Sequence, residues 1–357
     1  MSGFGKTLVT GASGFIGARL VEALTAAGAS VRAAASNEAS AARLRAKKSA
    51  EAVVADLADP ASMARAAEGC ATIFHVAYRF GGRQAAQAAV NIEGTRALAE
   101  AAARNGARRF VHFSSFAAQG PWRDGDLVEF ASPPPGADAY AVVKQKIDAM
   151  LLDMAKASKL PVAILQPTIV YGPRGGAWTK RPLHQVKDSR VALPRAGQGL
   201  CNAVFIDDVA SAALLAAERD DAVGEVFLIS GAAPVTWLDF YRAYAAMTGR
   251  VSVFPLDDAD FDAEEARRYG SSALLRKIRR RVEADARLRK FAGPLLPRDP
   301  AGTPPLYLPD PGTRALYSAK THVRVDKARR LLGYEPAFDL ARGMDATARW
   351  ARAAGLL

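Results

Sequence analysis

The sequence predicts an α/β protein: a doubly wound parallel sheet with helices on both faces, followed by a smaller C-terminal lobe. Short β-prone runs alternate with alanine-rich helical patterns from the first residues to about Pro167. A glycine-rich turn at residues 11–17 separates the first of these runs from the first helical pattern. After Pro167 the alternation loosens, so we expect the second lobe to begin near residue 170.

The predicted elements of the first lobe follow in order along the chain. The β-prone runs are Lys6–Thr10, Ser30–Ala35, 52–55, 72–76, 110–114 and 162–166, and the longest helical pattern covers about 84–105. Repeated strand–helix units place such strands in parallel, and ligands bind at their carboxyl ends. We therefore expect residues 1–170 to form a dinucleotide-binding domain of the Rossmann type.

Residues 171–357 are expected to form mainly a substrate-binding lobe, with residues 204–230 returning to the main domain. That returning segment contains two β-prone runs, 204–206 and Glu225–Ile229, and a helical pattern from Asp207. A further helix should follow Thr236, because Thr236 and Asp239 have the spacing of a capping box. The chain closes with helical patterns at Asp326–Leu332 and Leu340–Ala353.

Residues 273–291 predict a basic amphipathic helix. Its apolar positions are Leu274, Ile278 and Val282, and its basic positions are Arg276, Lys277, Arg279, Arg280 and Arg281. We expect the helix to cover the small lobe and present its charge to water; peripheral contact with a membrane or an acidic partner is the alternative. The prolines that follow predict an irregular arm: Pro294, Pro297, Pro300, Pro304, Pro305, Pro309 and Pro311.

The composition narrows the classes of function. The chain has 357 residues, 50% of them hydrophobic, which suits one large domain with a smaller lobe. Its only two cysteines, Cys70 and Cys201, indicate a reducing compartment, and without a signal peptide or a membrane-spanning run we expect a cytoplasmic protein. The net charge of +12 comes with no nucleic-acid-binding motif, so it favours anionic small ligands, with solubility as the alternative.

The glycine-rich turn predicts a pyrophosphate site. A strand, a glycine-rich turn and a helix N-terminus direct backbone N–H groups and the helix dipole at an anion. The glycines permit the tight turn, the close approach of the phosphate and the packing of the helix on the strand. The residues expected to form this site are Gly11, Ser13, Gly14, Phe15, Ile16 and Gly17.

Tyr140 and Lys144 form the strongest candidate catalytic pair. They stand four positions apart, so on a helix they share one face. A free phenol has a pKa of about 10, and a nearby cation lowers it. Tyr140 thus becomes a candidate acid or base for proton exchange with a substrate.

Together these motifs resemble the extended short-chain dehydrogenase/reductase family, which includes nucleotide-sugar epimerases and dehydratases. The resemblance covers most of the chain and follows the order of the family's markers. These are TGASGFIG at 10–17, DL at 56–57, FHVA at 74–77, NIEGT at 91–95, SS at 114–115, YAVVK at 140–144, PTIVYGP at 167–173, VFIDDV at 204–209 and LGYEP at 332–336.

The resemblance implies a Ser-Tyr-Lys active site. Tyr140 would exchange a proton with a substrate hydroxyl or carbonyl, while Lys144 would lower the Tyr140 pKa and hold the nicotinamide ribose. Ser115 would bind and orient the substrate oxygen. Ser114 is the adjacent alternative, because successive strand residues face opposite ways.

The resemblance also implies a bound NAD or NADP. Asp56 and Leu57 would bracket the adenine, Val76 and Ala77 would line the cofactor channel, and Pro167 and Val170 would lie behind the nicotinamide. Family members of this kind form homodimers, here through the helices near 84–105 and at Tyr140.

Other polar residues receive structural interpretations. We expect His75 to pack within its strand, and Asn91 and Thr95 to serve helix packing and loop bonding. Asp207 and Asp208 suit a helix N-terminus. No spacing of His, Cys or Asp indicates a metal site.

The residues at the end of the second predicted strand do not decide between NAD and NADP. NAD-preferring proteins carry an acidic residue there, whereas this chain has Ala35 followed by Ser36. Ser36 would bond a 2′-phosphate, with Arg43 or Lys47 in support, so both NAD and NADP remain candidates.

Three further departures from the family pattern bear on the reaction. Phe116 and Ala117 replace the acidic pair of dehydratases, which argues against dehydration. Residues 201–203 lack the basic side chain with which many epimerases hold a diphosphate. The alternative candidates to replace it are Arg174, Arg181, Arg190 or Arg195, and the sequence does not select one of them. Gln166 also replaces the usual arginine before Pro167.

The sequence therefore predicts an NAD(P)-dependent oxidoreductase acting on a secondary alcohol or ketone, first as a sugar or nucleotide-sugar epimerase or ketoreductase. The alternative enzyme is a dehydrogenase or reductase of an apolar ketone, of the hydroxysteroid or flavonoid-reductase type. A non-catalytic NAD(P)-binding sensor is the alternative of another class. The intact Ser115, Tyr140 and Lys144 argue against the sensor.

Overall fold

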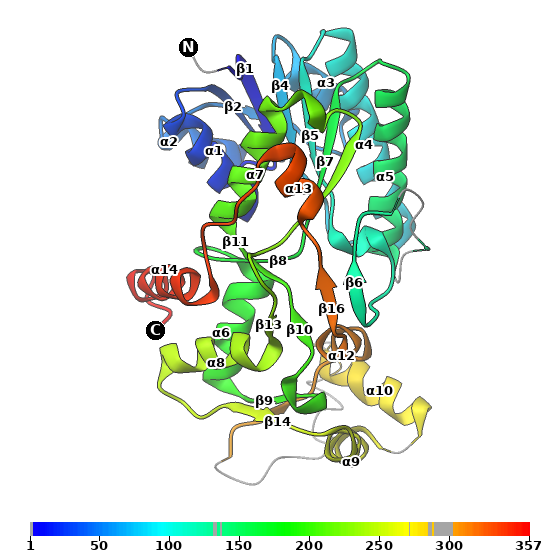
Figure 1. Cartoon of the computed structure of the whole chain (residues 1–357), viewed down its shortest axis with the longest axis vertical. Coiled ribbons are helices and arrows are strands. Elements are labelled where there is room, and N and C mark those ends of the chain that lie inside the picture. Colours follow the sequence, from blue (N-terminus) through cyan, green and yellow to red (C-terminus); the bar gives the residue numbers. More distant parts are fainter. Residues whose placement is uncertain (1–2, 131–133, 136–137, 271, 285–287, 289–302) are drawn as a thin grey trace.

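A seven-stranded parallel sheet organises the protein, as the sequence predicts (Figure 1). The structure is a computed structural model that describes residues 3–130, 134–135, 138–270, 272–284, 288 and 303–357. The strand order is β12-β7-β5-β4-β1-β2-β3. These strands are β1 (Lys6–Thr10), β2 (Ser30–Ala35), β3 (Glu51–Val54), β4 (Thr72–His75), β5 (Arg109–Phe113), β7 (Val162–Pro167) and β12 (Glu225–Ile229).

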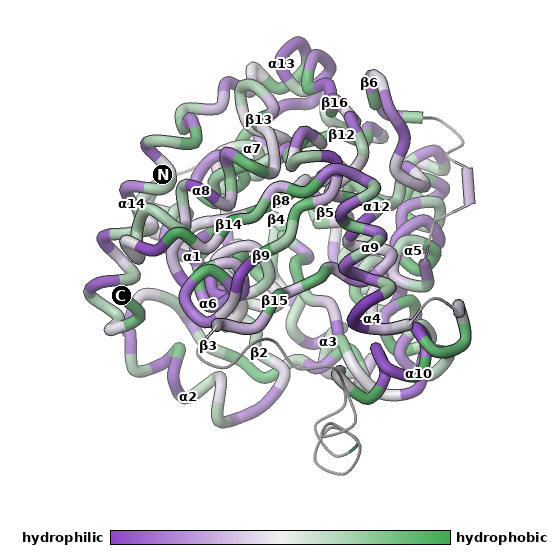
Figure 2. The backbone as a smooth tube through the Cα atoms, turned by 90° about the horizontal axis from the view of Figure 1, so that it is seen from below, coloured by the Kyte–Doolittle hydropathy of each residue, from purple (hydrophilic) through white to green (hydrophobic). Residues whose placement is uncertain are grey.

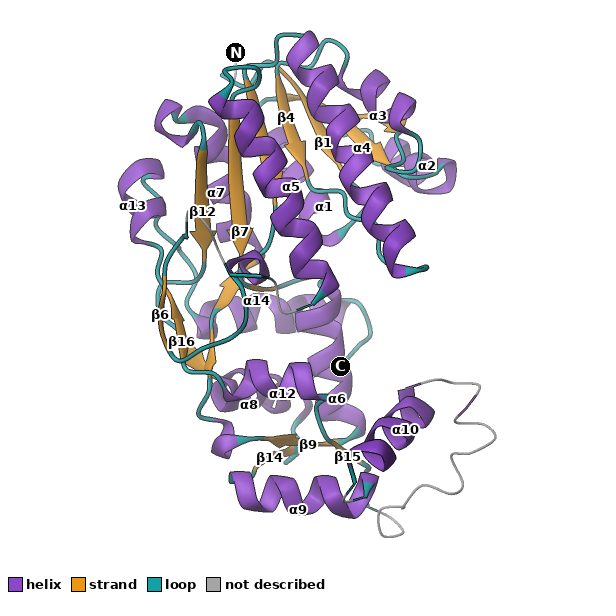
Figure 3. Ribbon diagram, turned by 90° about the vertical axis from the view of Figure 1, so that its right-hand side faces the viewer, coloured by secondary structure: helices purple, strands orange, loops and turns teal. Residues whose placement is uncertain are grey.

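Helices cover both faces of the sheet (Figure 3). One face packs against α1 (Phe15–Ala26), α2 (Glu38–Ala46) and α7 (Ile206–Glu218). The other packs against α3 (Pro60–Ala67), α4 (Gln84–Arg104) and α5 (Ala139–Lys156). Central strands buried on both faces explain why the β runs read as continuous apolar segments rather than alternating ones.

The second lobe lies beyond the carboxyl ends of the strands (Figures 1 and 3). Its short strands form a three-stranded sheet of order β14-β9-β15. Its elements are α6 (Arg181–Asp188), β9 (Arg190–Leu193), β10 (Leu200–Cys201), β13 (Val235–Thr236), α8 (Trp237–Thr248), β14 (Val253–Pro255), α9 (Asp258–Tyr269), α10 (Ala273–Ala284), β15 (Leu306–Tyr307), α12 (Pro311–Ser318) and α14 (Leu340–Ala353). Buried aromatic side chains dominate its core, among them Trp237, Phe240 and Tyr244.

Several segments tie the two lobes together. Residues 204–230 return as expected: α7 packs on α1, and β12 pairs with β7 at the sheet edge. The helix α13 (Asp326–Leu332) also returns and packs against β12 and α7. Short strand pairs join the lobes, β8 (Ile169–Tyr171) with β11 (Ala203–Phe205) and β6 (Gly125–Leu127) with β16 (Thr321–Val323). The boundary at residue 170 stays a prediction.

The capping box predicted at Thr236 is present. The Thr236 hydroxyl accepts a hydrogen bond from the backbone N–H of Asp239 at 3.0 Å, and the Asp239 carboxylate accepts one from the Thr236 N–H at 3.2 Å. These bonds satisfy N–H groups that the first turn of a helix leaves unpaired.

Of the expected irregular arm, Pro304, Pro305 and Pro309 lie outside helices and strands as predicted, whereas Pro311 departs from it. Pro304 and Pro305 lead into β15, and Pro311 opens α12. A proline suits the first turn of a helix, and Asp310 caps this turn by accepting bonds from the N–H groups of Gly312 and Thr313 at 3.0 and 3.1 Å. Pro294, Pro297 and Pro300 lie outside the described residues.

The basic helix predicted at 273–291 is described over Ala273–Ala284. We expected its apolar side to cover the small lobe and its basic side to face water. Instead, Arg280 points inward and pairs with Glu265, while Leu274 and Ile278 are exposed. Of the rest, only Leu288 is described. In the described part of the chain, no helix combines the length and apolarity needed to cross a membrane.

Gly94 fixes the approach of α4 to the loop that follows β3. A Cβ atom at this position would lie 2.5 Å from the carbonyl oxygen of Leu57. We expect Gly94→Ala to destabilise the fold by about 1–3 kcal/mol, because backbone must shift to relieve this contact. Urea unfolding measures the change, and Gly176→Ala is the control, since a Cβ there would meet nothing within 4 Å. Equal stabilities of the two variants would contradict the account.

Candidate active site

A cleft of about 630 Å³ opens at the carboxyl edge of the sheet. Its position agrees with the rule that doubly wound sheets bind ligands where their strands end. Its lining residues are Gly11, Ser13, Gly14, Phe15, Ile16, Gly17, Ser36, Asn37, Ala55, Asp56, Leu57, Val76, Ala77, Tyr78, Arg79 and Phe80. The structure thus gathers around one cleft every residue predicted from the glycine-rich turn, from positions 36 and 56–57, and from positions 76–77.

The glycine-rich turn has the geometry of a phosphate cradle. A Cβ at Gly17 would lie 2.2 Å from the carbonyl oxygen of Gly11, and one at Gly11 would lie 3.0 Å from the Ala77 backbone. Gly11 also has a φ of +63°. The N-cap of α1 is Gly14, which has no side chain to cap the first N–H groups. A diphosphate suits this position, because it can accept from those groups.

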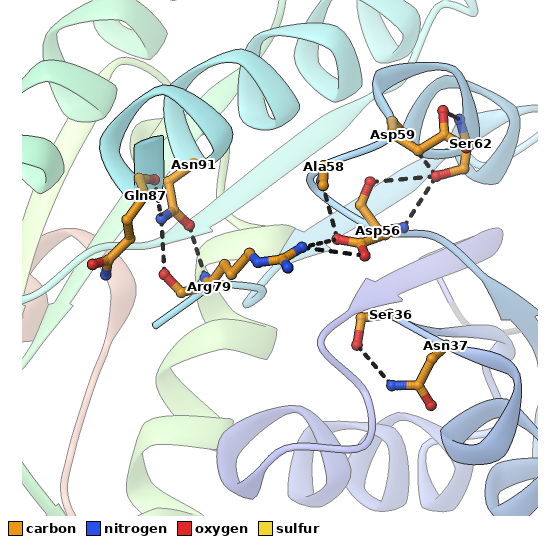
Figure 4. A network of polar contacts seen from close by, with 9 residues as sticks. All are labelled: Ser36, Asn37, Asp56, Ala58, Asp59, Ser62, Arg79, Gln87 and Asn91. Atoms are coloured by element: carbon orange, nitrogen blue, oxygen red, sulfur yellow. Dashed lines mark hydrogen bonds and ion pairs between the residues drawn. The ribbon is translucent and has the colours of Figure 1, made fainter. Parts of the chain in front are cut away.

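A polar network closes the other end of the cleft (Figure 4). Arg79 donates to Asp56, with Nη1 3.3 Å from Oδ1. Asn91 holds the backbone of Arg79 from both sides: its Oδ1 accepts from the N–H at 2.8 Å, and its Nδ2 donates to the carbonyl at 3.0 Å. The loop-bonding role expected for Asn91 is therefore confirmed, whereas Arg79 was not predicted.

Tyr140 and Ser115 meet beside the cleft. Ser115, just after β5, lies close enough to Tyr140, in the first turn of α5, for its hydroxyl to affect the pKa of Tyr140. Burial raises the pKa of Tyr140 to about 12, although the nearby Ser115 hydroxyl has a lowering effect on it. Ser114 points elsewhere, into the core, where its hydroxyl donates to Asp148 at 2.6 Å.

Lys144 is buried, and its ammonium binds the backbone at the end of β5. Nζ donates to the carbonyl of Phe113 at 2.7 Å and lies 6.0 Å from the centroid of the Tyr140 ring. The lowering of the Tyr140 pKa expected from Lys144 is not what the structure shows: burial dominates and raises that pKa. A Tyr140 phenol that keeps its proton at neutral pH suits a proton donor.

Asp148, one turn beyond Lys144, is a buried acid that the sequence analysis missed. Its Oδ2 accepts from Ser114 at 2.6 Å and from Gln166 Nε2 at 3.0 Å. Burial raises its pKa to about 6 and lowers that of Lys144 to about 8, while the two charges favour each other. Gln166, noted as a departure, receives a bond from Gln119 at 2.6 Å and so completes a buried chain of polar groups.

Two buried histidines lie under this network. His75 is held between Thr10 and Thr95 at 2.9 and 2.8 Å, which confirms its expected packing role. Burial lowers its pKa to about 3, so it is neutral. His112 stacks on it and stands 3.6 Å from Asp148. Among the described residues, neither ring nitrogen of His112 has a hydrogen-bond partner.

An aromatic pair connects Tyr140 to the cleft. Tyr78 meets the Tyr140 ring edge-on at 5.1 Å, and Phe80 stacks on it at 6.0 Å between centroids. Both belong to the cleft lining, and Phe80 is 73% exposed. Pro167 and Val170 lie in β7 and β8 and are not among the lining residues. The aromatic residues just after a strand end were the signal that the sequence analysis overlooked.

The segment 201–203, where the sequence lacks the basic diphosphate anchor of many epimerases, has a structural role. Asn202 is buried, donates to the Thr321 carbonyl at 2.8 Å and accepts from the Val323 N–H at 3.0 Å. Of the arginines considered as substitutes, Arg174 pairs with Glu22 at 2.6 Å. Arg181 lines a second cavity, of about 590 Å³, in the small lobe.

Asp207 and Asp208 lie in the first turn of α7, as expected. Asp207 pairs with Arg19 at 2.6 Å. Asp208 accepts from the backbone N–H of Ala337 at 2.8 Å. Both carboxylates thus bind protein groups that join α7 to α1 and to the C-terminal segment.

The parallel sheet and the cleft at its carboxyl edge are typical of dinucleotide-binding enzymes. Comparisons with known proteins identify the family. Residues 7–230 match the NAD dependent epimerase/dehydratase family, and the chain belongs to this family, as the sequence motifs indicated. The protein is therefore an NAD(P)-dependent enzyme of the extended short-chain dehydrogenase/reductase type.

Relatives extend the match beyond those residues. The chain is 27% identical to a 4-hydroxy-2-methyl-3-oxo-4-farnesyl-3,4-dihydroquinoline-1-oxide ketoreductase of Stigmatella aurantiaca, over 96% of this chain and 95% of that protein. It is 35% identical to sterol demethylase protein B of Methylococcus capsulatus, over 63% and 69%. A UDP-glucuronic acid 4-epimerase structure from Bacillus cereus shares the fold, with 20% identity, a TM-score of 0.72, and coverage of 98% and 99%.

Asp148 is expected to set the pH range of activity through Lys144. Because its negative charge favours the Lys144 ammonium, Asp148→Asn should lower the Lys144 pKa below about 8. Loss of an opposite charge at this range shifts a pKa by roughly one to three units, so the alkaline limb of the activity profile should move to lower pH. The measurement is kcat against pH for NAD(P)-dependent turnover.

The matched control is Asp153→Asn, which removes an exposed acid from the same helix. Its alkaline limb should coincide with that of the unmodified protein. Superimposable profiles for Asp148→Asn and the unmodified protein would contradict the assigned influence of Asp148.

Proposed function

We propose that the protein interconverts a ketone and a secondary alcohol on a largely apolar substrate, with net transfer of a hydride. The observation that carries this proposal is the contact of Tyr140 with the aromatic rings of Tyr78 and Phe80, with the Ser115 hydroxyl close by. The hydroxyl pair suits a carbonyl oxygen, and the rings suit an apolar body next to it.

Tyr140, Ser115 and Lys144 have different roles in the proposed reaction. A bound nicotinamide dinucleotide supplies or accepts the hydride. Tyr140 gives its proton to the ketone oxygen in reduction and recovers one in oxidation, while Ser115 orients that oxygen. At neutral pH the Tyr140 phenol carries its proton, which is the form that donates to the ketone oxygen in reduction. Lys144, held at the end of β5, places its positive charge near the site.

Other features support an apolar substrate over a nucleotide sugar. In the segment where many epimerases carry a diphosphate anchor, this chain has Asn202, whose amide is bonded within the protein. The names of the two relatives describe a ketoreductase of a farnesyl-bearing quinoline oxide and a component of sterol demethylation. Phe116 and Ala117 follow Ser115 without an acid, which disfavours dehydration.

A nucleotide-sugar epimerase is the second candidate. The small-lobe cavity of about 590 Å³ favours it, because Arg181, Arg268 and Arg280 line that cavity and would suit an anionic group. An epimerase reduces its own intermediate and shows no net oxidation of NAD(P)H. Incubation with a 3-ketosteroid and with UDP-glucose, followed by absorbance of the reduced cofactor, separates the two.

Replacing the proton donor tests the catalytic proposal. Tyr140→Phe should lower kcat by about 10²–10⁴-fold, because general acid catalysis contributes on that scale, and leave cofactor affinity nearly unchanged. Tyr78→Phe, which removes a neighbouring hydroxyl, should retain most of the activity. Stopped-flow kinetics and fluorescence titration of the cofactor give the two readouts. Undiminished turnover by Tyr140→Phe would refute the mechanism.

We further propose that the preferred cofactor carries a 2′-phosphate. The supporting feature is a hollow of about 270 Å³ that shares Ser13, Gly14 and Phe15 with the main cleft. Ser40, Arg43 and Lys47 of α2 and its C-cap also line it. At the end of β2, Ala35 followed by Ser36 stands where NAD-preferring proteins carry an acidic residue that would repel a phosphate.

Affinity for 2′,5′-ADP and for 5′-AMP tests this preference without catalysis. The double variant Arg43→Ala with Lys47→Ala should lose about ten-fold or more in affinity for 2′,5′-ADP, and little for 5′-AMP. Arg45→Ala is the control, because Arg45 stands on the same helix but is bonded to Glu38. Calorimetry that finds equal affinities for both ligands in the unmodified protein would contradict the 2′-phosphate site.

A further inference from the structure

The helix α10 presents its apolar side outward. Leu274, Leu275 and Ile278 are 69%, 45% and 50% exposed. At 100° per residue these three positions fall within one sector of the helix, so they form a continuous outward stripe. In Figures 2 and 3 the helix lies at the periphery of the small lobe. Amphipathic helices of a globular protein normally turn such a stripe toward the core.

Contacts on the opposite side of α10 fix this orientation. The Arg280 side chain is only 16% exposed, and its Nη2 donates to Glu265 of α9 at 2.6 Å. Its Nη1 donates to the Pro309 carbonyl at 3.1 Å, and the guanidinium lies 4.4 Å from the centre of the Tyr269 ring. Rotating the apolar stripe inward would break this ion pair and leave the largely buried Glu265, which is 14% exposed, with Arg314 as its remaining ion-pair partner among the described residues.

Basic side chains border the stripe. Lys277 and Arg281 are exposed. Lys277 stands three positions after Leu274, and Arg281 three after Ile278, so each cation lies beside an exposed apolar residue. An exposed apolar stripe edged by cations is the arrangement of helices that lie in the plane of an anionic membrane surface.

The positive charge of the protein favours an anionic membrane over a second copy of the chain as the partner of the stripe. The chain carries a net charge of +12, so a second copy would bring a like-charged surface to the same place. A bilayer with anionic lipids offers both an apolar layer for the leucines and phosphates for Lys277 and Arg281. No helix in the described residues could cross a membrane, so such contact is peripheral.

We propose that α10 docks the protein on the surface of an anionic lipid bilayer. Leu274, Leu275 and Ile278 enter the boundary between headgroups and acyl chains, and Lys277 and Arg281 contact the lipid phosphates. This docking stands on α10 alone and does not require the proposed ketone substrate. Where both hold, the enzyme meets apolar substrate at the membrane in which that substrate dissolves.

Co-sedimentation of the full chain with vesicles tests the docking. We expect binding to phosphatidylcholine vesicles that contain about 30% phosphatidylserine, and weak binding to pure phosphatidylcholine, because basic segments respond to anionic lipid. The paired substitutions Leu274→Ser with Ile278→Ser, and Lys277→Glu with Arg281→Glu, should each reduce the bound fraction about ten-fold. Val251→Ser is the control, since Val251 is 93% exposed elsewhere on the small lobe.

Circular dichroism and cofactor titration establish that each variant is folded, and neither readout depends on the identity of the substrate. Equal binding to both kinds of vesicle would overturn the proposal, as would unchanged binding of the two α10 variants. Analytical ultracentrifugation adds a third decisive outcome. If the lipid-free protein forms a dimer that only the α10 variants dissolve, a second copy covers the stripe and the membrane proposal fails.

Discussion

The burial of Lys144 and Asp148, one helical turn apart on α5, is the constraint on which the site depends. Two ionisable groups in a protein interior persist only where hydrogen bonds and their mutual attraction offset the lost hydration. Here the Phe113 carbonyl accepts a hydrogen bond from the Lys144 ammonium. Ser114 and Gln166 donate hydrogen bonds to the Asp148 carboxylate. These bonds tie α5 to β5 and β7, so Tyr140 on the same helix is positioned by the sheet itself.

That attachment explains the geometry of the whole carboxyl edge. Ser114 turns inward to Asp148, and the next residue, Ser115, therefore turns toward Tyr140. The glycine-rich turn after β1 and the Arg79 loop after β4 end at the same edge and complete the cleft. Parallel strands bring these distant segments together, because all their carboxyl ends lie on one side.

The sequence was sufficient for the sheet and for most of the cleft. The glycine-rich turn and the strand ends are local signals, because backbone conformation and burial on both faces dictate residue type directly. Asp148 and Arg79 escaped prediction, because their roles arise from partners such as Ser114 and Asp56, far apart in the chain. The Tyr140 pKa was misjudged for the same reason: the spacing to Lys144 shows a neighbouring charge but not the burial that outweighs it.

In the small lobe, local pattern predicted elements better than orientation. The amphipathic pattern of α10 was visible, yet Arg280 pairs inward with Glu265 and Leu274 and Ile278 face outward. The prolines before α12 resembled an irregular arm, although a proline also suits a helix start when an aspartate such as Asp310 caps it. In both cases one tertiary or capping interaction decides between two arrangements that the sequence permits.

Transfer of an isotopic label tests the central claim, net hydride transfer to an apolar ketone, most directly. The protein is incubated with a 3-ketosteroid and reduced cofactor deuterated at C4 of the nicotinamide, and the product is examined by mass spectrometry. The account predicts an alcohol that carries one deuterium on the carbinol carbon, with one cofactor oxidised for each product formed. An unreacted ketone, together with UDP-glucose epimerised without net cofactor oxidation, would contradict it.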